Sequence, residues 1–290
     1  MAEGGSLINF GELSKPATIL VEKICNAVGI VYEPTRIKRQ AGAEAHAEKI
    51  RALAKIEIGA LEQRALERFV HQETRKQENI EQITAQAAAA LRDDSNVEAL
   101  EDDWIAHFFK QCDIVSDKEM QTLWARMLAG EATTPGTYSK RTIDFVSSFD
   151  KKDAALFTAL CQFVWVIGTT NPLIYDIEGD VYKSQGINFT SLKHLDAIGL
   201  ISLDATGGYQ QLRIPKHFRA YYYGRPTLLE AVGDADNQLK IGHALFTAVG
   251  RELVPICGSC RNESFYQYVI QRWSQQGIVL STDLASEATV

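Results

Sequence analysis

The chain has 290 residues, of which 46% are hydrophobic and 23% charged, so it is long enough for two ordinary domains and is not a disordered protein. A net charge of -7 argues against a protein that coats nucleic acid, although it leaves room for local basic patches. Five cysteines, an odd number and mostly far apart in the sequence, do not suit a disulfide framework and favour the reducing cytoplasm.

The stretch from Thr35 to Thr134 contains no proline and only three of the chain's glycines. Proline costs about 3 kcal/mol inside a helix and glycine about 1 kcal/mol, so their absence from a stretch rich in Ala, Glu, Gln, Lys and Arg predicts helix. We therefore expect a mainly α protein. A long N-terminal helical arm and a helical bundle should be followed by a smaller α+β domain that resembles a winged helix.

The first expected element is an amphipathic helix within residues 1–34. Ser14 is a suitable N-cap for it, and its apolar face contains Leu20, Ile24 and Val28. This face either packs on the body of the protein or offers a surface to a membrane or a partner. The pattern alone is compatible with both interpretations.

Residues 35–92 are expected to form a long helical arm with sparse apolar residues. Such a helix is too polar to be a self-contained core element, so it lies along another element or pairs with another chain. Residues 35–92 carry eleven Lys and Arg against eight Asp and Glu, whereas residues 93–119 carry two against nine. This charge difference predicts that arm and acidic helix meet, within one chain or between the subunits of a homo-oligomer.

Residues 93–170 are expected to fold as a helical bundle. Its helices begin at four N-caps, namely Ser95, Ser116, Ser139 and Asp150. The second helix is expected to end at Gly130, and the last to continue through Ile167. The uncharged segment 154–175 has fewer apolar residues than the roughly 20 that a membrane span needs, so we expect a buried core helix and no transmembrane span.

Residues 171–280 are expected to form the α+β domain. A short helix capped by Thr190 is followed by two β-branched or polar runs, 200–203 and 210–214, which are separated by glycines and predict a hairpin. Helix followed by hairpin is the core of a winged helix. Residues 281–290 are expected to be a disordered tail.

Several basic residues of this domain are candidate contacts for nucleic acid or for a protein partner. They are Lys193, His194, Arg213, Lys216 and Arg219. A helix that reads DNA usually offers more cations than one lysine and one histidine. A protein-packing role is therefore favoured, and nucleic-acid binding stays an alternative.

Cys257 and Cys260 form a C-x-x-C sequence just before the last expected helix, where a helix N-terminus can lower the pKa of a thiol. A zinc site would need two further ligands, and the chain has no second C-x-x-C. Redox or metal chemistry at this pair is the alternative to two small residues in a loop, which is the favoured interpretation.

The chain contains no P-loop, dinucleotide-binding, zinc-protease or nucleophile-elbow motif. Each absence is weak evidence alone, but together they lower the expectation of an enzyme. We accordingly assign no catalytic, cofactor-binding or metal-binding residues and expect a non-enzymatic protein.

Short blocks spread over most of the chain resemble a bacterial family, the domain of unknown function 2806. These blocks are Leu13–Pro16, Tyr32–Pro34, Gln77–Ile80, Asp103–Ile105, Leu123–Glu131, and then Pro135, Gly136 and Ser139. The block that includes Trp124 and Glu131 is the most specific. The opening of the chain is also similar to abortive-infection alpha proteins, which implies a role in bacterial defence against phage but no catalytic residues.

Together these observations predict a cytoplasmic, self-associating interaction protein that senses or blocks a phage component. Its expected partners are further copies of itself and a protein that is phage-derived or encoded nearby. Two alternatives stay open. One is a nucleic-acid-binding regulator that uses the winged helix, and the other is a protein held at a membrane surface by the helix that contains Leu20, Ile24 and Val28.

Overall fold

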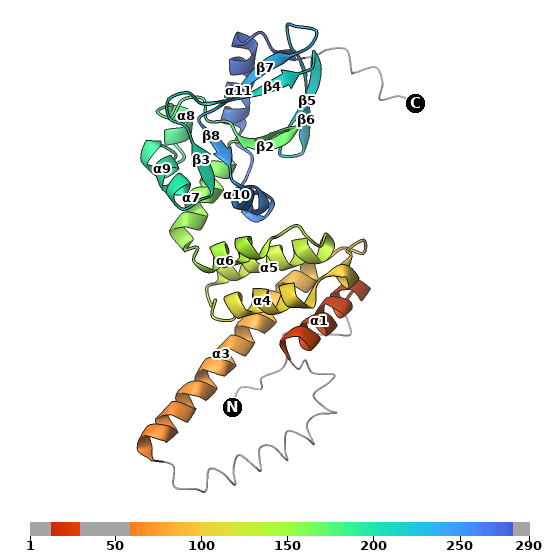
Figure 1. Ribbon diagram of the computed structural model, residues 1–290, viewed down its shortest axis with the longest axis vertical. Helices are drawn as coiled ribbons and strands as arrows, with labels where there is room; N and C mark the ends of the chain where they lie inside the picture. The colour runs from red at the N-terminus through yellow and green to blue at the C-terminus, as the bar shows by residue number, and fades with distance from the viewer. Residues whose placement is uncertain (1–12, 30–58, 281–290) are drawn as a thin grey trace. The chain divides into compact units, whose positions relative to one another are not determined.

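A computed structural model describes residues 13–29 and 59–280 of the chain (Figure 1). The chain divides into two compact units, unit 1 up to Ser148 and unit 2 from Phe149 onwards, and each is described by itself. This division lies earlier than the boundary expected after residue 170.

Parts of several expected elements lie outside the described residues. These are the segment before residue 13, residues 30–58, which include the first part of the expected arm, and the expected tail at 281–290. The arm is therefore described only from residue 59.

Unit 1 is helical in its described part. Its elements are α1 (Lys15–Val28), α3 (Ala60–Ala90), the short 3-10 helix η2 (Val97–Ala99), α4 (Asp102–Cys112), α5 (Lys118–Thr133) and α6 (Lys140–Ser147). The Ser14 hydroxyl accepts a hydrogen bond from the Ala17 amide at the start of α1, and Gly29 ends this helix with φ +76°. Both ends of α1 thus agree with the sequence.

The core of unit 1 is built around aromatic side chains of α4 and α5. Trp104 stacks on Phe108 with ring centroids 5.1 Å apart, and Phe108 meets the fully buried Trp124 edge to face at the same separation. Around this cluster α1 packs on α3 and α4, α3 on α5, and α4 on α6.

Two of the expected N-caps in unit 1 are wrong. The Ser95 hydroxyl accepts from the Arg92 amide, and α4 begins later, at Asp102. The Ser116 hydroxyl accepts from Arg75 Nε, and the Asp117 carboxylate caps α5 in its place by accepting from the amides of the next turn. Other parts of the chain compete for both serine hydroxyls. The expected starts at Ser139 and Asp150 are confirmed.

Within residues 149–280, unit 2 begins with α7 (Lys151–Cys161) and contains nine strands. They are β1 (Val164–Ile167), β2 (Thr169–Pro172), β3 (Ile201–Leu203), β4 (Tyr209–Ile214), β5 (His217–Tyr222), β6 (Arg225–Glu230), β7 (Asn237–Gly242), β8 (Ala244–Phe246) and β9 (Val279–Leu280). The other helices are α8 (Asp180–Lys183), α9 (Phe189–Ala197), α10 (Ala248–Leu253), the 3-10 helix η3 (Val254–Ile256) and α11 (Glu263–Gln275).

The expected long core helix through Ile167 is wrong, because α7 ends at Cys161. The β-branched residues after it form β1 and β2, an antiparallel pair that turns at Gly168, where φ is +67°. These strands start a five-stranded antiparallel sheet in the order β2-β1-β5-β6-β9. The start of α9 also differs, because Asn188 caps it and Thr190 lies inside the helix.

The expected hairpin of residues 200–203 and 210–214 does not form. Strand β3 pairs with β8, and β4 pairs with β7, both antiparallel. Strands from residues 237–246, later in the chain, therefore pair with the two segments that were expected to pair with each other. The turn at Gly207 and Gly208 is a loop closed by the Asp204 carboxylate, which accepts from the Gly207 amide.

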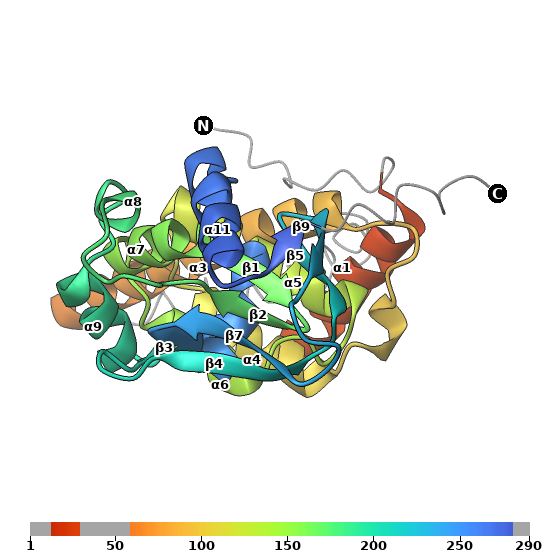
Figure 2. The same cartoon turned by 90° about the horizontal axis from the view of Figure 1, so that it is seen from above.

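Helix α11 lies beside strands of the five-stranded sheet (Figure 2), and aromatic side chains of both elements contact each other. Trp165 on β1 stacks on Tyr222 of β5 at 5.0 Å and meets Trp273 of α11 edge to face at 4.8 Å. All three side chains are fully buried.

The described residues of both units form mainly helices, together with small sheets in unit 2, which confirms the expected fold class in coarse outline.

The turn between α5 and α6 is held by a buried carboxylate. Glu131 is only 3% exposed, and its two oxygens accept hydrogen bonds from the amides of Gly136 (2.6 Å) and Tyr138 (2.7 Å). The Tyr138 ring lies against Gly130, where an added Cβ would come within 2.8 Å of Cε2. The glycine is needed for this contact and does not end the helix, so the expected helix end at Gly130 is wrong and α5 continues to Thr133. We call Trp104, Gly130, Glu131, Gly136 and Tyr138 the turn clamp, because the Trp104 indole also donates to the Tyr138 carbonyl at 2.8 Å.

Replacing Glu131 with Gln should lower the free energy of unfolding of unit 1 by about 1–3 kcal/mol, because an amide has one acceptor oxygen and would set its NH2 against the other backbone N–H. Faster hydrogen exchange at the Gly136 and Tyr138 amides measures this effect locally. Glu98→Gln, at an exposed position of η2, is the matched control. Equal protection in both variants would contradict the role of the carboxylate.

Candidate functional site

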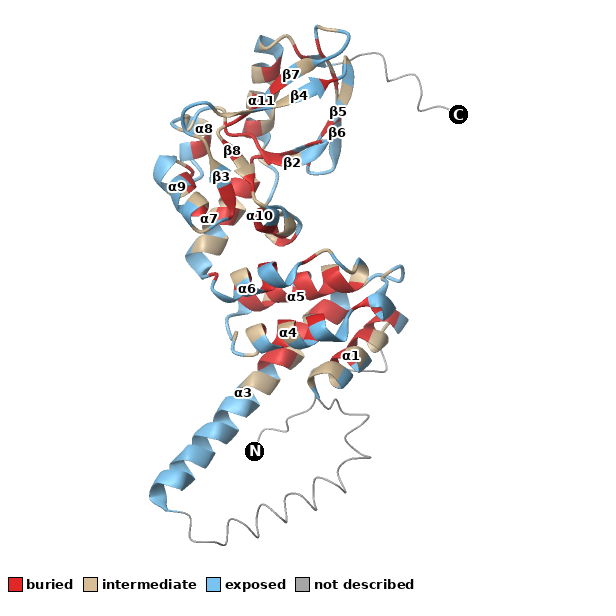
Figure 3. Cartoon of the chain, in the orientation of Figure 1, coloured by how far each residue is buried: buried red, intermediate tan, exposed pale blue. Residues whose placement is uncertain are grey.

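The N-terminal half of α3 is exposed, although it carries large apolar side chains (Figure 3). Leu66 is 45%, Phe69 59% and Val70 56% exposed, whereas Ile83 and Ala87 in the second half are fully buried. Apolar side chains of this size on one stretch of helix are unusual for a solvated surface. We call Leu66, Phe69 and Val70 the exposed stripe.

The exposed stripe continues the face by which α3 packs on the core of unit 1. Leu66 lies about five helical turns before the buried Thr84, and Phe69 about three turns before Ile80, so each pair shares nearly the same angle around the helix axis. The other helices of unit 1 cover this face only in the C-terminal half of α3, where α1, α4 and α5 pack on the helix. The apolar face of α3 is therefore buried in the C-terminal half of the helix and exposed in the N-terminal half.

The described part of the arm is balanced in charge. Residues 59–92 contain five Lys and Arg and five Asp and Glu, so the basic surplus of residues 35–92 falls in the segment outside the described residues. Within the chain the arm meets the acidic region through Lys76, whose ammonium lies 3.7 Å from the Asp113 carboxylate. A contact of the kind expected between the arm and the acidic helix is thus present within unit 1.

An acidic patch surrounds the start of α4. Its exposed carboxylates are those of Asp93, Asp94, Glu98, Glu101, Asp102 and Asp103. Lys23 lies 3.9 Å from Asp102, and Arg92 pairs with Asp94 at 3.2 Å. Carboxylates at a helix N-terminus favour the helix electrostatically, which gives the patch a role within unit 1.

The candidate membrane or partner face of α1 is mostly covered. Leu20 and Ile24 are fully buried against the other helices of unit 1, and Val28 is half-buried. The residues that were candidates for a membrane contact therefore belong to the core. Among the described residues, no helix has the length and apolar content that a membrane crossing requires.

The candidate nucleic-acid or partner contacts lie on different elements of unit 2. On α9, Lys193 forms a 2.7 Å ion pair with Asp196, and His194 Nε2 lies 2.6 Å from the Asp153 carboxylate. The Lys193 hydrogen bond is the main cause that lowers the pKa of Asp196. Both basic groups of α9 therefore face a carboxylate.

The remaining candidates lie on or next to β4 and β5. Arg213 is exposed near the end of β4 with φ +59°, and Arg219 is exposed on β5. Lys216, in the link between these strands, pairs with Asp234 at 3.0 Å. No single basic surface is evident from these contacts.

The two cysteines of the C-x-x-C sequence differ in their surroundings. Cys257 is half-buried, and its thiol donates to the Val254 carbonyl, whereas Cys260 is exposed. Burial raises the pKa of the Cys161 thiol well above its usual value, and the neighbouring Cys257 raises it further. Within the described part of the chain, no cluster of three or more His, Cys, Asp or Glu could hold a metal ion.

Unit 2 contains a polar cavity of about 520 Å³ that the sequence did not predict. Lys240, His243 and Arg272 line it, and they come from β7, the β7–β8 link and α11. No local spacing in the sequence connects these positions. The pairing of β4 with β7 and the placement of α11 bring them together.

Comparison with known proteins gives one informative result. A family model described as "Protein of unknown function (DUF2806)" matches residues 63–270, which is more than half of the chain. The matched segment includes the exposed stripe and the turn clamp. No curated protein and no solved structure matches the chain.

Because Leu20 is fully buried, Leu20→Ala should destabilise unit 1 by about 3 kcal/mol, whereas Val28→Ala should have a smaller effect. Urea unfolding followed by far-UV circular dichroism measures the difference. Most of this apolar face is then covered within unit 1, so the native chain should stay at the bottom of a liposome flotation gradient. Flotation of the native protein together with unchanged stability of Leu20→Ala would restore the membrane interpretation.

Proposed function

The chain belongs to the DUF2806 family of proteins of unknown function, and we propose that it is a cytoplasmic, non-enzymatic interaction protein that self-associates through α3. The single observation that carries this proposal is the exposed stripe of Leu66, Phe69 and Val70. The occupant that we assign to this stripe is the same stripe of a second copy.

A second copy suits the stripe for two reasons. The stripe continues a face of α3 that is buried within unit 1 at Ile80 and Thr84, so a second helix can extend the same packing along the axis. The charges of residues 59–92 balance, so two identical arms approach each other without net repulsion. A two-fold arrangement is the common outcome when one surface meets itself.

The order of elements in unit 2 supports a winged-helix-like arrangement as the finer fold. Helix α7, the β1–β2 pair, α8 and α9 precede β3, and β8 returns beside β3 after a long excursion. In this interpretation residues 204–243 take the place of the wing. Because Lys193 and His194 each face a carboxylate, the exposed side of α9 favours a protein-packing role over nucleic-acid reading.

We place the biological role in bacterial defence against phage, as the hypothesis that the opening of the chain suggests. The support is the resemblance of Leu13–Pro16 and Tyr32–Pro34 to abortive-infection alpha proteins. Assembly through α3 would then be the step that a phage component triggers or that builds a blocking complex.

Phe69→Glu should convert the assembled protein into a monomer, because the carboxylate would be buried without a partner at the contact. Since Phe69 is 59% exposed, the fold itself should lose less than about 0.5 kcal/mol. Size-exclusion chromatography with light scattering gives the molar mass directly. Contacts between apolar side chains should also survive about 1 M salt.

His71→Glu is the matched control, since it introduces the same residue at an exposed position about 200° around the helix from Phe69. It should leave the assembly intact. A native chain that is monomeric at every protein and salt concentration would remove the proposal, and an assembly that dissociates in high salt would assign the contact to charges instead of the stripe.

In a bacterial host challenged with a panel of phages, expression of the native chain should lower the plating efficiency of at least one phage. Phe69→Glu should abolish this protection and His71→Glu should keep it, because only the former removes the apolar contact. Equal plating with all three proteins would reject the defence role, whereas the light-scattering result would still decide the assembly.

A further inference from the structure

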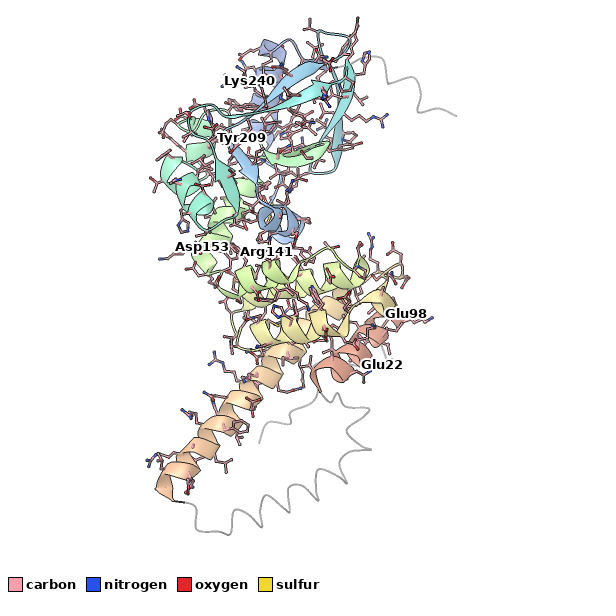
Figure 4. All side chains as sticks on the ribbon, in the orientation of Figure 1. Glu22, Glu98, Arg141, Asp153, Tyr209 and Lys240 are labelled. Atoms are coloured by element: carbon pink, nitrogen blue, oxygen red, sulfur yellow. The ribbon has the colours of Figure 1, made fainter. Side chains whose placement is uncertain are left out.

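The polar cavity of unit 2 lies where β4 and β7 pair and α11 ends. Tyr209 and Gln210 on β4 are opposite Gly242 and Lys240 on β7 (Figure 4). The complete lining consists of Tyr175, Gly207, Gly208, Tyr209, Gln210, Lys240, Gly242, His243, Arg272, Gln275 and Gln276. Its volume of about 520 Å³ is in the range of small-molecule sites.

The charged side chains that line this cavity are basic, although the chain as a whole carries -7. Lys240 and Arg272 are its cations, His243 is a further basic side chain, and no aspartate or glutamate lines it. Neither Lys240 nor Arg272 forms a salt bridge with a carboxylate of the described residues. Cations without carboxylate partners around a cavity favour an anionic ligand.

Aromatic rings hold Arg272 in place. Its guanidinium lies over the rings of Tyr175 and Tyr268, 5.8 Å and 5.9 Å from their centroids. The Tyr175 hydroxyl accepts from the Trp273 indole at 2.8 Å, and burial raises the pKa of this tyrosine. The hydroxyl therefore stays neutral and supplies no counter-ion. Stacking orders the guanidinium while its N–H groups stay available for a ligand.

One ring nitrogen of His243 is engaged with the backbone. Its Nδ1 lies 2.8 Å from the Asp204 carbonyl, which can only accept, so Nδ1 carries a proton and Nε2 is left for another partner. The Asp204 carboxylate does not line the cavity. The amide of Gly207 is the main cause that lowers the pKa of Asp204, which ties this carboxylate to its own loop.

The wall beside His243 is fixed by backbone contact. Gly242 has φ +108°, and an added Cβ would come within 2.1 Å of the Ile174 carbonyl oxygen, so only glycine lets β7 approach this segment. The His243 amide donates to the same carbonyl at 2.7 Å. The cavity is thus part of the folded frame of unit 2, and the backbone of β7 and the β7–β8 link, which carries Lys240 and His243, is held in place.

We propose that this cavity binds a phosphorylated small molecule of about mononucleotide size. Arginine binds phosphate oxygens with two parallel N–H donors, and Lys240 adds a point charge. The amides of Gln210, Gln275 and Gln276 supply donors and acceptors for a polar or heterocyclic remainder, and the ring of Tyr209 offers it a face. This site is independent of the exposed stripe on α3.

Isothermal titration calorimetry of the full chain tests the site with AMP, ATP, inorganic phosphate, adenosine and malate. We expect both nucleotides to bind, inorganic phosphate to bind more weakly, and adenosine and malate to bind at least about tenfold more weakly than AMP. Adenosine or malate binding as tightly as AMP would overturn the assignment to phosphate. No binding of any phosphate at about 1 mM would overturn the site.

Variants then locate the binding in the cavity. Lys240→Gln and Arg272→Gln should each weaken AMP binding by about tenfold or more. Lys240 is exposed, so its variant keeps the fold even if loss of the Arg272 stack does not. Arg219→Gln is the matched control, because it removes an exposed cation of unit 2 outside the cavity. Unchanged binding by Lys240→Gln, or equal weakening by Arg219→Gln, would overturn the proposal.

Discussion

The buried carboxylate of Glu131 is the constraint on which unit 1 depends. A carboxylate that is almost fully removed from water must be matched by hydrogen bonds, and here two backbone amides after the end of α5 supply them. The turn that carries these amides also places the Tyr138 carbonyl on the Trp104 indole. One charge thereby fixes the ends of α5 and α6 relative to α4. The specific sequence block that ends at Glu131 has a structural explanation in this contact.

The core of unit 1 packs against the C-terminal half of α3 and leaves the N-terminal half of this helix exposed. The helices that pack on α3 reach only its C-terminal half, so a single apolar face is covered at Ile83 and exposed at Phe69. Nothing in the helix pattern itself changes between these two residues. The difference arises from how far the neighbouring helices extend along α3, and for this reason the exposed stripe belongs to the chain's assembly in our proposal.

Local signals in the sequence were sufficient where a cap uses only its own turn, as at Ser14 and Asp150. They failed where a distant group takes the same atom, as at Ser116, whose hydroxyl is bonded by a side chain of α3. Strand pairing failed for the same reason, because β3 finds its partner in β8, about forty residues later. The cavity cations Lys240 and Arg272 are likewise brought together only by tertiary structure.

The pairing of β6 with β9 has a consequence for the order of synthesis. Leu229 pairs with Leu280, and Trp273 closes the aromatic core over Trp165, so unit 2 cannot complete its sheet until residue 280 has been made. Unit 1 has its described contacts within the first 148 residues. It can therefore fold on the ribosome while unit 2 is still being made, and α3 is in place before the sheet of unit 2 is complete.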